Sequence, residues 1–249
     1  MELENKIVKW ISDYTDNSQL DSYIVGISGG IDSAVTSILC ALTGKRTIII
    51  SLPIHQNKSH LIRAQNHIEN LKSRFENVES LEIDLSNVLE SFLTNFSNKN
   101  QLSEANTRSR LRMMTLYHVA SLNNGLVVGT GNKVEDFGVG FYTKYGDGGV
   151  DISPIADLLK SEVKRLAIKL NVIQEIIEAK PSDGLWDDDR SDEDQIGASY
   201  EELEWAMNYI EQNKHTNLTE REKTVLNIFT KFNTKNRHKM MPIPIFKNE

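Results

Sequence analysis

The residues most able to do chemistry stand in one octapeptide, GISGGIDS, at residues 26–33. Its adjacent glycines let a backbone come close to an anion, and the hydroxyls of Ser28 and Ser33 can bond to that anion. If a helix starts here, its first N–H groups have no partner within the helix, and its dipole is positive at this end. The octapeptide therefore predicts a site for a phosphate or pyrophosphate group. The plainer alternative is a tight turn in which Ser28 caps the helix.

The elements that must position this octapeptide are read from the spacing of apolar residues. Apolar runs, typical of strands buried on both faces, alternate with segments whose apolar residues recur three or four apart. Predicted strands are 21–27, 47–52, 78–85 and 125–129, and predicted helices are 31–42, 61–71, 88–96, 106–123, 158–170 and 199–211. This alternation predicts an α/β fold with a doubly wound parallel sheet flanked by helices. Because no repeat and no linker is visible, we expect a single domain over residues 1–249.

The octapeptide resembles the pyrophosphate loop of the N-type ATP pyrophosphatases, which cleave ATP between its α and β phosphates. It matches neither GxxxxGK[ST] nor GxGxxG. Further segments are similar to the NAD synthetase family of that superfamily, in the same order: NTRSRLRM (106–113), GTGNKVE with FYTKYGDGGVDISP (129–154), KPSDGLW (180–186) and HK (238–239). The resemblance covers residues 26–239 and implies a Rossmann-like fold of the adenine nucleotide alpha hydrolase type.

The resemblance implies a cytoplasmic ligase that forms a C–N bond. The carboxylate of deamido-NAD (nicotinic acid adenine dinucleotide) attacks the α-phosphorus of ATP and expels pyrophosphate; ammonia then attacks the acyl-adenylate, giving NAD and AMP. Because two anions meet in the first step, metal and cationic side chains must neutralise charge, and no dedicated catalytic acid or base is expected. The single cysteine, Cys40, fits a reducing compartment, and without a glutaminase signature we expect free ammonia as the nitrogen source.

The family pattern also implies roles for individual residues. It places ATP on Gly26, Ile27, Ser28, Gly29, Gly30, Ile31, Asp32, Ser33, Thr130, Lys160 and Ser182. It places deamido-NAD on Arg110, Lys144, Asp151, His238 and Lys239, and Mg²⁺ on Asp32 and Glu135. Carboxylate oxygens suit Mg²⁺, the arginine fork suits phosphate, and a lysine that heads a helix needs an anionic partner. The plain alternatives are a helix-stabilising aspartate, a solvated loop glutamate, a surface lysine and a basic helix face formed by Arg108, Arg110 and Arg112.

Several loops have unusual compositions. Residues 129–150 hold seven of the 14 glycines, which predicts a loop, and the interval from Glu135 to Lys144 is about one residue longer than in many relatives. Residues 183–194 hold seven acids and one base, so nearly all of the net charge of −7 lies beside Ser182, in either a solvated loop or a lid. The polar segment 55–60 corresponds to a lid in relatives. Residues 231–239 hold four bases and no acid.

Composition excludes other classes of protein. The chain has no apolar run of about 18 residues, the length that a membrane span needs, and its N-terminus lacks the layout of a signal peptide. Its six histidines form neither HExxH nor a Cys/His cluster, so we expect no zinc site. We expect no nucleic-acid partner, and a homodimer with deamido-NAD at an interface to which the helix 106–123 contributes. Two alternatives stay open: another N-type ATP pyrophosphatase such as a tRNA-modifying enzyme, and a non-catalytic nucleotide-binding module.

Overall fold

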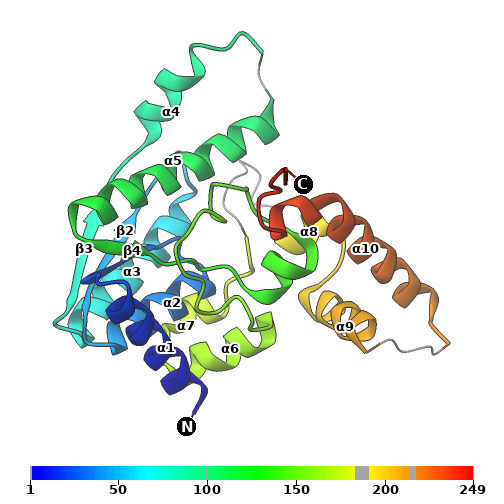
Figure 1. Cartoon of the computed structure of the whole chain (residues 1–249), viewed down its shortest axis with the longest axis horizontal. Coiled ribbons are helices and arrows are strands. Elements are labelled where there is room, and N and C mark those ends of the chain that lie inside the picture. The colour runs from blue at the N-terminus through cyan, green and yellow to red at the C-terminus, as the bar shows by residue number, and fades with distance from the viewer. Residues whose placement is uncertain (1, 99, 183–190, 213–216, 249) are drawn as a thin grey trace.

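The computed structural model describes residues 2–98, 100–182, 191–212 and 217–248. Within them, four parallel strands form one sheet in the order β3-β2-β1-β4. The strands are β1 (Ser22–Gly26), β2 (Arg46–Ser51), β3 (Val78–Glu82) and β4 (Gly125–Val127). Helices cover both faces of this sheet (Figure 1), which confirms the predicted doubly wound α/β class. The strand order reverses between β1 and β4, and in such sheets ligands bind at the carboxyl ends of the strands at this point.

Alternate residues of the strands point to opposite faces and bury two separate apolar clusters. On one face, Tyr23 and Val25 of β1 pack against five helices. These are α1 (Leu3–Asn17), α2 (Ile31–Leu42), α3 (Lys58–Arg74), α6 (Lys160–Lys169) and α7 (Gln174–Ile177). On the other face, Ile24 packs with α4 (Ser86–Leu93) and α5 (Gln101–Leu122). Apolar residues on both faces are expected of a parallel sheet that helices cover on both sides.

A third apolar cluster lies beside the sheet and consists of helices alone. It joins η1 (Val134–Val139), α8 (Asp192–Ile196), α9 (Tyr200–Glu211) and α10 (Glu220–Met240). Figure 1 shows α9 and α10 next to each other, away from the strands. Both helices begin with a capping box, Ser199 with Glu202 and Thr219 with Glu222, in which each side chain bonds to the other residue's N–H group. No helix within the described residues is long and apolar enough to cross a bilayer.

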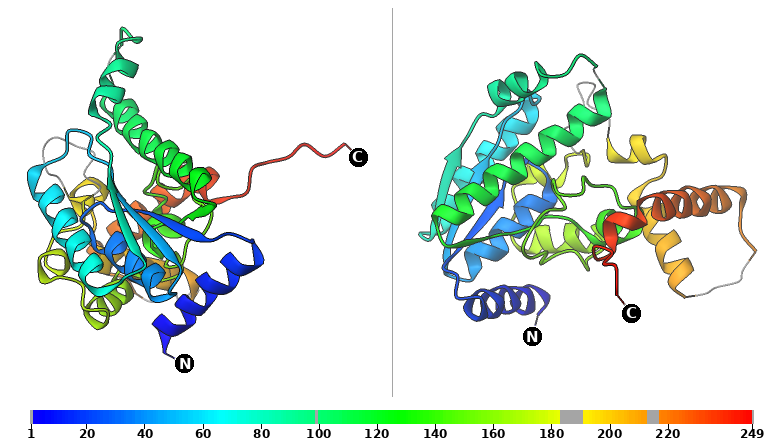
Figure 2. Two further views of the ribbon diagram at one scale, coloured as in Figure 1. Left: turned by 90° about the vertical axis from the view of Figure 1, so that its left-hand side faces the viewer. Right: turned by 45° about the horizontal axis from the view of Figure 1, so that its top comes forward.

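Several predicted boundaries are wrong. Two long helices, α1 and α10, were not predicted, because the N-terminal segment was left unassigned and the C-terminal one was interpreted as a basic stretch. The short helix α7 was not predicted either. Helix α5 begins at Gln101 and not at residue 106, whereas β3 ends at Glu82, three residues early. Of the predicted acidic loop, residues 183–190 lie outside the described residues, and residues 192–196 form the short helix α8. After α10 the chain leaves the body of the molecule (Figure 2).

The glycine-rich segment 129–150 is a loop over most of its length, but it contains a π-helix, η1. In a π-helix the backbone hydrogen bonds join residues five apart, so each bonded turn encloses one more residue than in an α-helix. Such turns are often found at functional sites. It ends at Gly140, which has a φ of 64° and lies against α10: an added Cβ would be 2.4 Å from Cβ of Asn236. The Asn236 side chain donates to the carbonyl of Val139 at 2.8 Å and holds this end in place.

Candidate functional site

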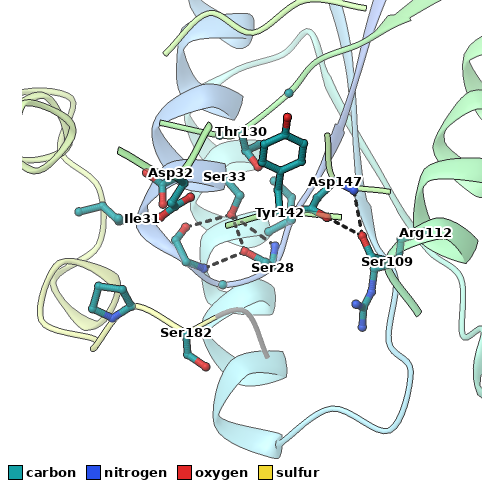
Figure 3. Close-up of a pocket in the computed structure, with 18 of the residues that line it drawn as sticks. Ser28, Ile31, Asp32, Ser33, Ser109, Arg112, Thr130, Tyr142, Asp147 and Ser182 are labelled. Carbon is teal, nitrogen blue, oxygen red and sulfur yellow. Dashed lines mark hydrogen bonds between the residues drawn. The ribbon is translucent and has the colours of Figure 1, made fainter. Parts of the chain in front are cut away.

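A pocket opens at the carboxyl ends of β1 and β4, where the strand order reverses. Every residue that the sequence predicted for ATP lines this pocket, from Gly26–Ser33 to Thr130, Lys160 and Ser182, and so does Glu135. Figure 3 shows Ser28 and Ser33 joined by hydrogen bonds in the pocket wall, with a second bonded pair, Ser109 and Asp147, in another part of it. The five residues predicted for deamido-NAD do not line it.

The octapeptide forms a compact turn whose helix is not capped by a side chain. The cap position of α2 is Gly30, so the alternative in which Ser28 caps the helix is wrong. The hydroxyls of Ser28 and Ser33 lie 3.2 Å apart, and Ser33 donates to the carbonyl of Gly30 at 2.9 Å. Gly29 has a φ of 81°, and a Cβ there would be 2.6 Å from the carbonyl oxygen of His60 on α3. The turn therefore packs closely on α3 and presents the positive end of α2 to the pocket.

A buried ion cluster adjoins this turn; we call Asp32, Asn132, Glu135, Lys160 and Tyr200 the carboxylate–lysine cluster. Nζ of Lys160 donates to Oδ2 of Asp32 at 2.5 Å and to Oε1 of Glu135 at 3.1 Å. The Asn132 side chain donates to Oδ1 of Asp32 at 3.3 Å and accepts from the N–H of Glu135 at 3.2 Å. The Tyr200 hydroxyl donates to Oε1 of Glu135 at 2.5 Å. Three distant segments of chain thus meet around one ammonium group.

The protonation of the cluster follows from its burial and its charges. Burial would lower the pKa of Lys160, but attraction by the carboxylates of Asp32 and Glu135 outweighs this and raises that pKa. Burial raises the pKa of Asp32 while the Lys160 ammonium opposes the change. Burial and the adjacent carboxylates also raise the pKa of Tyr200, so its hydroxyl remains a donor. Lys160 therefore stays charged and has the anionic partner that its place at the start of α6 requires.

The donor set of Asp32 and Glu135 fits Mg²⁺. Both bonds to the Glu135 carboxylate, from Lys160 and from Tyr200, go to Oε1, and within the described residues Oε2 has no partner. Mg²⁺ typically uses one or two protein carboxylates and takes its other oxygens from substrate phosphates and water. Within the described residues no group of three or more His, Cys, Asp or Glu side chains could hold a metal. Two carboxylates beside the turn that the sequence predicts for phosphate fit a metal brought in with a nucleotide.

Another carboxyl group in the pocket wall, Asp136, follows Glu135 in the π-helix. Its oxygens lie against Gly131, where an added Cβ would be 2.2 Å from Oδ2, so Gly131 leaves the space that this side chain fills. Burial, helped by the charges of Glu135, Asp147 and Asp32, raises the pKa of Asp136 to about 8. Asp136 is therefore mostly protonated at neutral pH.

Four of the residues predicted for deamido-NAD lie in or against the loop 140–149; we call these four, Arg110, Lys144, His238 and Lys239, the rim set. Arg110 donates to the carbonyl of Lys144 at 3.3 Å, and Nζ of Lys144 donates to the carbonyl of His238 at 2.9 Å. Nζ of Lys239 donates to the carbonyls of Gly140 and Tyr142 at 2.7 Å. The structure brings these four together. Asp151 is held separately, by the Tyr117 hydroxyl and the N–H of Val127, each at 2.8 Å.

Among the polar residues of the pocket region that sequence reasoning missed are Asn132, Asp136, Asp192 and Tyr200. Asn132 and Asp136 stand in the same segment, GTGNKVED, as Glu135, so their spacing from Glu135 was a usable signal. Tyr200 follows Ser199, which with Glu202 has the S-x-x-E spacing of a capping box. That signal predicts where α9 begins. It does not predict that the first residue of α9 reaches Glu135, which depends on how the third cluster packs.

Comparison with known proteins adds an independent result. Residues 3–242 match the family model described as NAD synthase. An NH(3)-dependent NAD(+) synthetase from Methanosarcina acetivorans is 34% identical, over 97% of this chain and 96% of its own length. Among solved structures, NMN synthetase from Francisella tularensis has a TM-score of 0.87 at 32% identity and covers 99% of this chain and 98% of its own. NH3-dependent NAD synthetase from Campylobacter jejuni, solved with a nitrate ion, has a TM-score of 0.82 at 28% identity, covering 99% and 100%. Both alternatives, a tRNA-modifying enzyme and a non-catalytic module, are disfavoured by these matches.

Proposed function

Because the chain belongs to the NAD synthase family, we propose that the pocket at Gly26–Ser33 is where it joins ammonia to a carboxylate at the expense of ATP. Ammonia-dependent formation of NAD is its activity, and the reaction is that of a ligase that forms a C–N bond with ATP as co-substrate. The observation that supports this location is the convergence of the octapeptide, Thr130, Lys160 and Ser182 on one pocket.

The proposed reaction has two steps. The carboxylate oxygen of deamido-NAD bonds to the α-phosphorus of ATP and the bond to the β-phosphate breaks, releasing pyrophosphate and leaving an acyl-adenylate. Ammonia then attacks the carbonyl carbon, AMP leaves with the bond electrons, and the nitrogen loses one proton to give the amide. The N–H groups at the start of α2 and the hydroxyls of Ser28 and Ser33 orient the pyrophosphate, which is positioning and not covalent chemistry.

For the metal, we propose Asp32 and Glu135 as the protein ligands. When bound, Mg²⁺ neutralises phosphate charge and lowers the repulsion between the two anions of the first step. In the ligand-free protein the Lys160 ammonium lies between the two carboxylates. If a metal took its place at Asp32 and Glu135, the Lys160 ammonium, which lines the pocket, would be available to a phosphate group of ATP.

We propose that deamido-NAD binds along the rim set and Asp151, at the interface of a homodimer. An exposed apolar surface supports the dimer: Val88 and Phe92 of α4 and the next residue at that spacing, Phe96, are each between 45% and 55% exposed. Leu102 and Met114 on α5 are also exposed, at 60% and 56%. Figures 1 and 2 show α4 projecting from the body of the molecule beside α5. We place the enzyme in the cytoplasm, where ATP is available and a reducing environment suits the buried Cys40.

A second candidate substrate has a specific observation in its favour. The Francisella tularensis structure, which matches this chain over nearly the whole of both, is described as an NMN synthetase. The same two steps on nicotinic acid mononucleotide would give NMN. The chemistry and the ATP site are the same for both substrates, so only the contacts to the adenylate half of the dinucleotide differ.

One assay tests both substrates. Purified protein is incubated with Mg-ATP and ammonium chloride, with deamido-NAD in one arm and nicotinic acid mononucleotide in the other, and products are quantified by chromatography. We expect NAD, AMP and pyrophosphate in equal amounts from the first arm, and none when ammonium is replaced by glutamine. Release of ADP in place of AMP would contradict the adenylate mechanism. A higher kcat/KM in the second arm would assign the mononucleotide.

A further inference from the structure

The Tyr200 hydroxyl lies between two carboxylates that belong to different parts of the site. It is 2.5 Å from Oε1 of Glu135 and 3.1 Å from Oδ2 of Asp192, the first residue of α8. The residue is only 5% exposed, and the Lys160 ammonium lies 4.7 Å from the centre of its ring. A phenol has one hydrogen, so the shorter contact, to Glu135, is the bond that it makes in this state.

This bond determines which oxygen of Glu135 is left for a cation. Both Lys160 and Tyr200 donate to Oε1, which leaves Oε2 without a partner within the described residues. Lys160 is shared with Asp32 and would have to leave Glu135 when a metal binds between the two carboxylates. Tyr200 makes no bond to Asp32: it reaches Glu135 from the start of α9, and the second carboxylate near its hydroxyl is that of Asp192. It is the one described hydrogen-bond donor to the Glu135 side chain that can stay in place after Lys160 has moved.

Tyr200 is itself held in place from two directions. Its N–H donates to Oε1 of Glu193 at 2.9 Å, and its ring belongs to the third apolar cluster. Asp192, the second acceptor for the hydroxyl, is 6% exposed and bonds through its N–H to the carbonyl of Pro181 at 3.1 Å. The ring therefore has little freedom to move its hydroxyl out of reach of Glu135.

We propose that Tyr200 is a positioning residue for the metal: it holds Oε1 of Glu135 so that Oε2 is presented to the cation. This inference rests on the proposed function, which makes Glu135 a ligand. Groups that hydrogen-bond to a metal-ligating carboxylate orient it, and removing such a group typically lowers metal affinity about 10- to 100-fold.

The test replaces the hydroxyl and keeps the ring, with Tyr200→Phe. Its matched control is Tyr23→Phe, because Tyr23 is also fully buried and its hydroxyl accepts from Thr15 at 3.1 Å at the start of β1, the end away from the octapeptide. Binding of Mn²⁺ to each protein in the presence of a non-hydrolysable ATP analogue is measured from the EPR signal of free Mn²⁺. We expect Tyr200→Phe to weaken Mn²⁺ binding about 10-fold or more, and Tyr23→Phe to leave it within about twofold of wild type.

Two further variants separate this inference from the proposed function. Asp32→Asn and Glu135→Gln should each weaken Mn²⁺ binding at least as much as Tyr200→Phe. If they do and Tyr200→Phe binds Mn²⁺ like wild type, the positioning role is wrong and the metal assignment stands. If neither of them changes Mn²⁺ binding, the metal lies elsewhere, and both the assignment and the role of Tyr200 are overturned. Equal weakening by Tyr200→Phe and Tyr23→Phe would show a general loss of packing and would also overturn the inference.

Discussion

The carboxylate–lysine cluster and the rim set both gather charged side chains, but they hold them in opposite ways. In the cluster, Lys160 is 9% exposed and bonds to other charged side chains, Asp32 and Glu135. In the rim set, the hydrogen bonds that Arg110 and Lys144 make within the described part of the chain go to backbone carbonyls, and Arg110 is exposed. The charged groups of the cluster are therefore shielded from water and contact opposite charges, whereas those of the rim set keep much of their hydration.

The difference indicates how each region would meet a ligand. A buried charge is costly without a partner, so an incoming metal or phosphate must replace an existing ion pair of the cluster in the same event. Rim cations lose only weak carbonyl bonds and some water when a substrate arrives. We therefore expect substitutions in the cluster to affect both catalysis and folding stability, and substitutions in the rim set to affect substrate affinity alone.

The largest effect is expected where the cluster faces the nucleotide. Asp32→Asn keeps the size of the side chain but removes the charge that would hold the metal, so kcat/KM should fall about 1,000-fold, as for loss of one main electrostatic contact. Circular dichroism should show an unchanged fold. Asp13→Asn, on the exposed face of α1, serves as the control with unchanged kinetics. Wild-type turnover in Asp32→Asn would remove Asp32 from the site.

A stability measurement tests the burial of the cluster directly. Lys160→Met leaves the carboxylates of Asp32 and Glu135 facing each other without a cation, and the free energy of unfolding should fall by about 3–5 kcal/mol. Adding Mg²⁺ should raise the Tm of this variant more than that of wild type, because no ammonium has to be displaced. The control is Lys169→Met, on the same helix but at an exposed position, and its free energy of unfolding should fall far less. A response to Mg²⁺ no greater than in wild type would argue against a cation site between the carboxylates.

The pH dependence of stability separates the pocket from the rim. Asp136 has a pKa of about 8 in the folded protein against 3.8 in the unfolded chain. Between about pH 4 and pH 8 the unfolded state loses this proton and the folded state keeps it, so the carboxyl's contribution to stability decreases as pH rises, by at most ~1.4 kcal/mol per pH unit. Asp136→Asn cannot ionise. Urea unfolding should show the variant gaining on wild type from pH 4 to pH 8, and a constant difference would contradict the raised pKa.

The smallest effect is expected at the rim. Lys144→Ala removes one cation from the proposed path of deamido-NAD, which should raise KM for that substrate about 10-fold, the value of one charge-assisted contact. KM for ATP and the free energy of unfolding should stay at wild-type values. Lys231→Ala, on the exposed surface of α10, is the control. If KM for ATP rises in step, the rim and the pocket are not separate regions.

The sequence predicted the α/β class, the order of the sheet helices and the octapeptide, because apolar periodicity and glycine spacing are local signals. Local signals for the two long helices that were not predicted, α1 and α10, were present as well. Ile7 and Ile11 stand four apart in α1, and Thr219 with Glu222 marks the start of α10. The end of α10 was interpreted only as a basic stretch, because residues 231–239 hold four bases and no acid. Helix α10 nevertheless packs into the third apolar cluster through Val225 and Phe229.

In the candidate site, too, local signals predicted some features, and others depend on packing between distant elements. Asp32 and Glu135 were predicted because they stand in recognisable segments, and Lys160 because the family pattern implies it. The contact between Lys160 and both carboxylates, and the proposed role of Tyr200, depend on the packing of α9 against η1 and α6, which no local pattern encodes. Arg110, Arg108 and Arg112 could not be told apart by spacing. The structure distinguishes them, since Arg110 reaches the Lys144 carbonyl and Arg112 reaches that of Leu52 at 3.0 Å.

The π-helix at Val134–Val139 has a consequence for tracing the history of this chain. An inserted residue normally shifts every following side chain round a helix, but a π-helical turn can hold the extra residue. Here the turn still ends at Gly140, beside the Val139 carbonyl that accepts from Asn236 of α10. Length variation can therefore arise immediately after Glu135 without a frame shift in the loop that follows. Between Asp136 and Val139, a residue-by-residue alignment with a shorter homologue would then pair side chains that have no common ancestor.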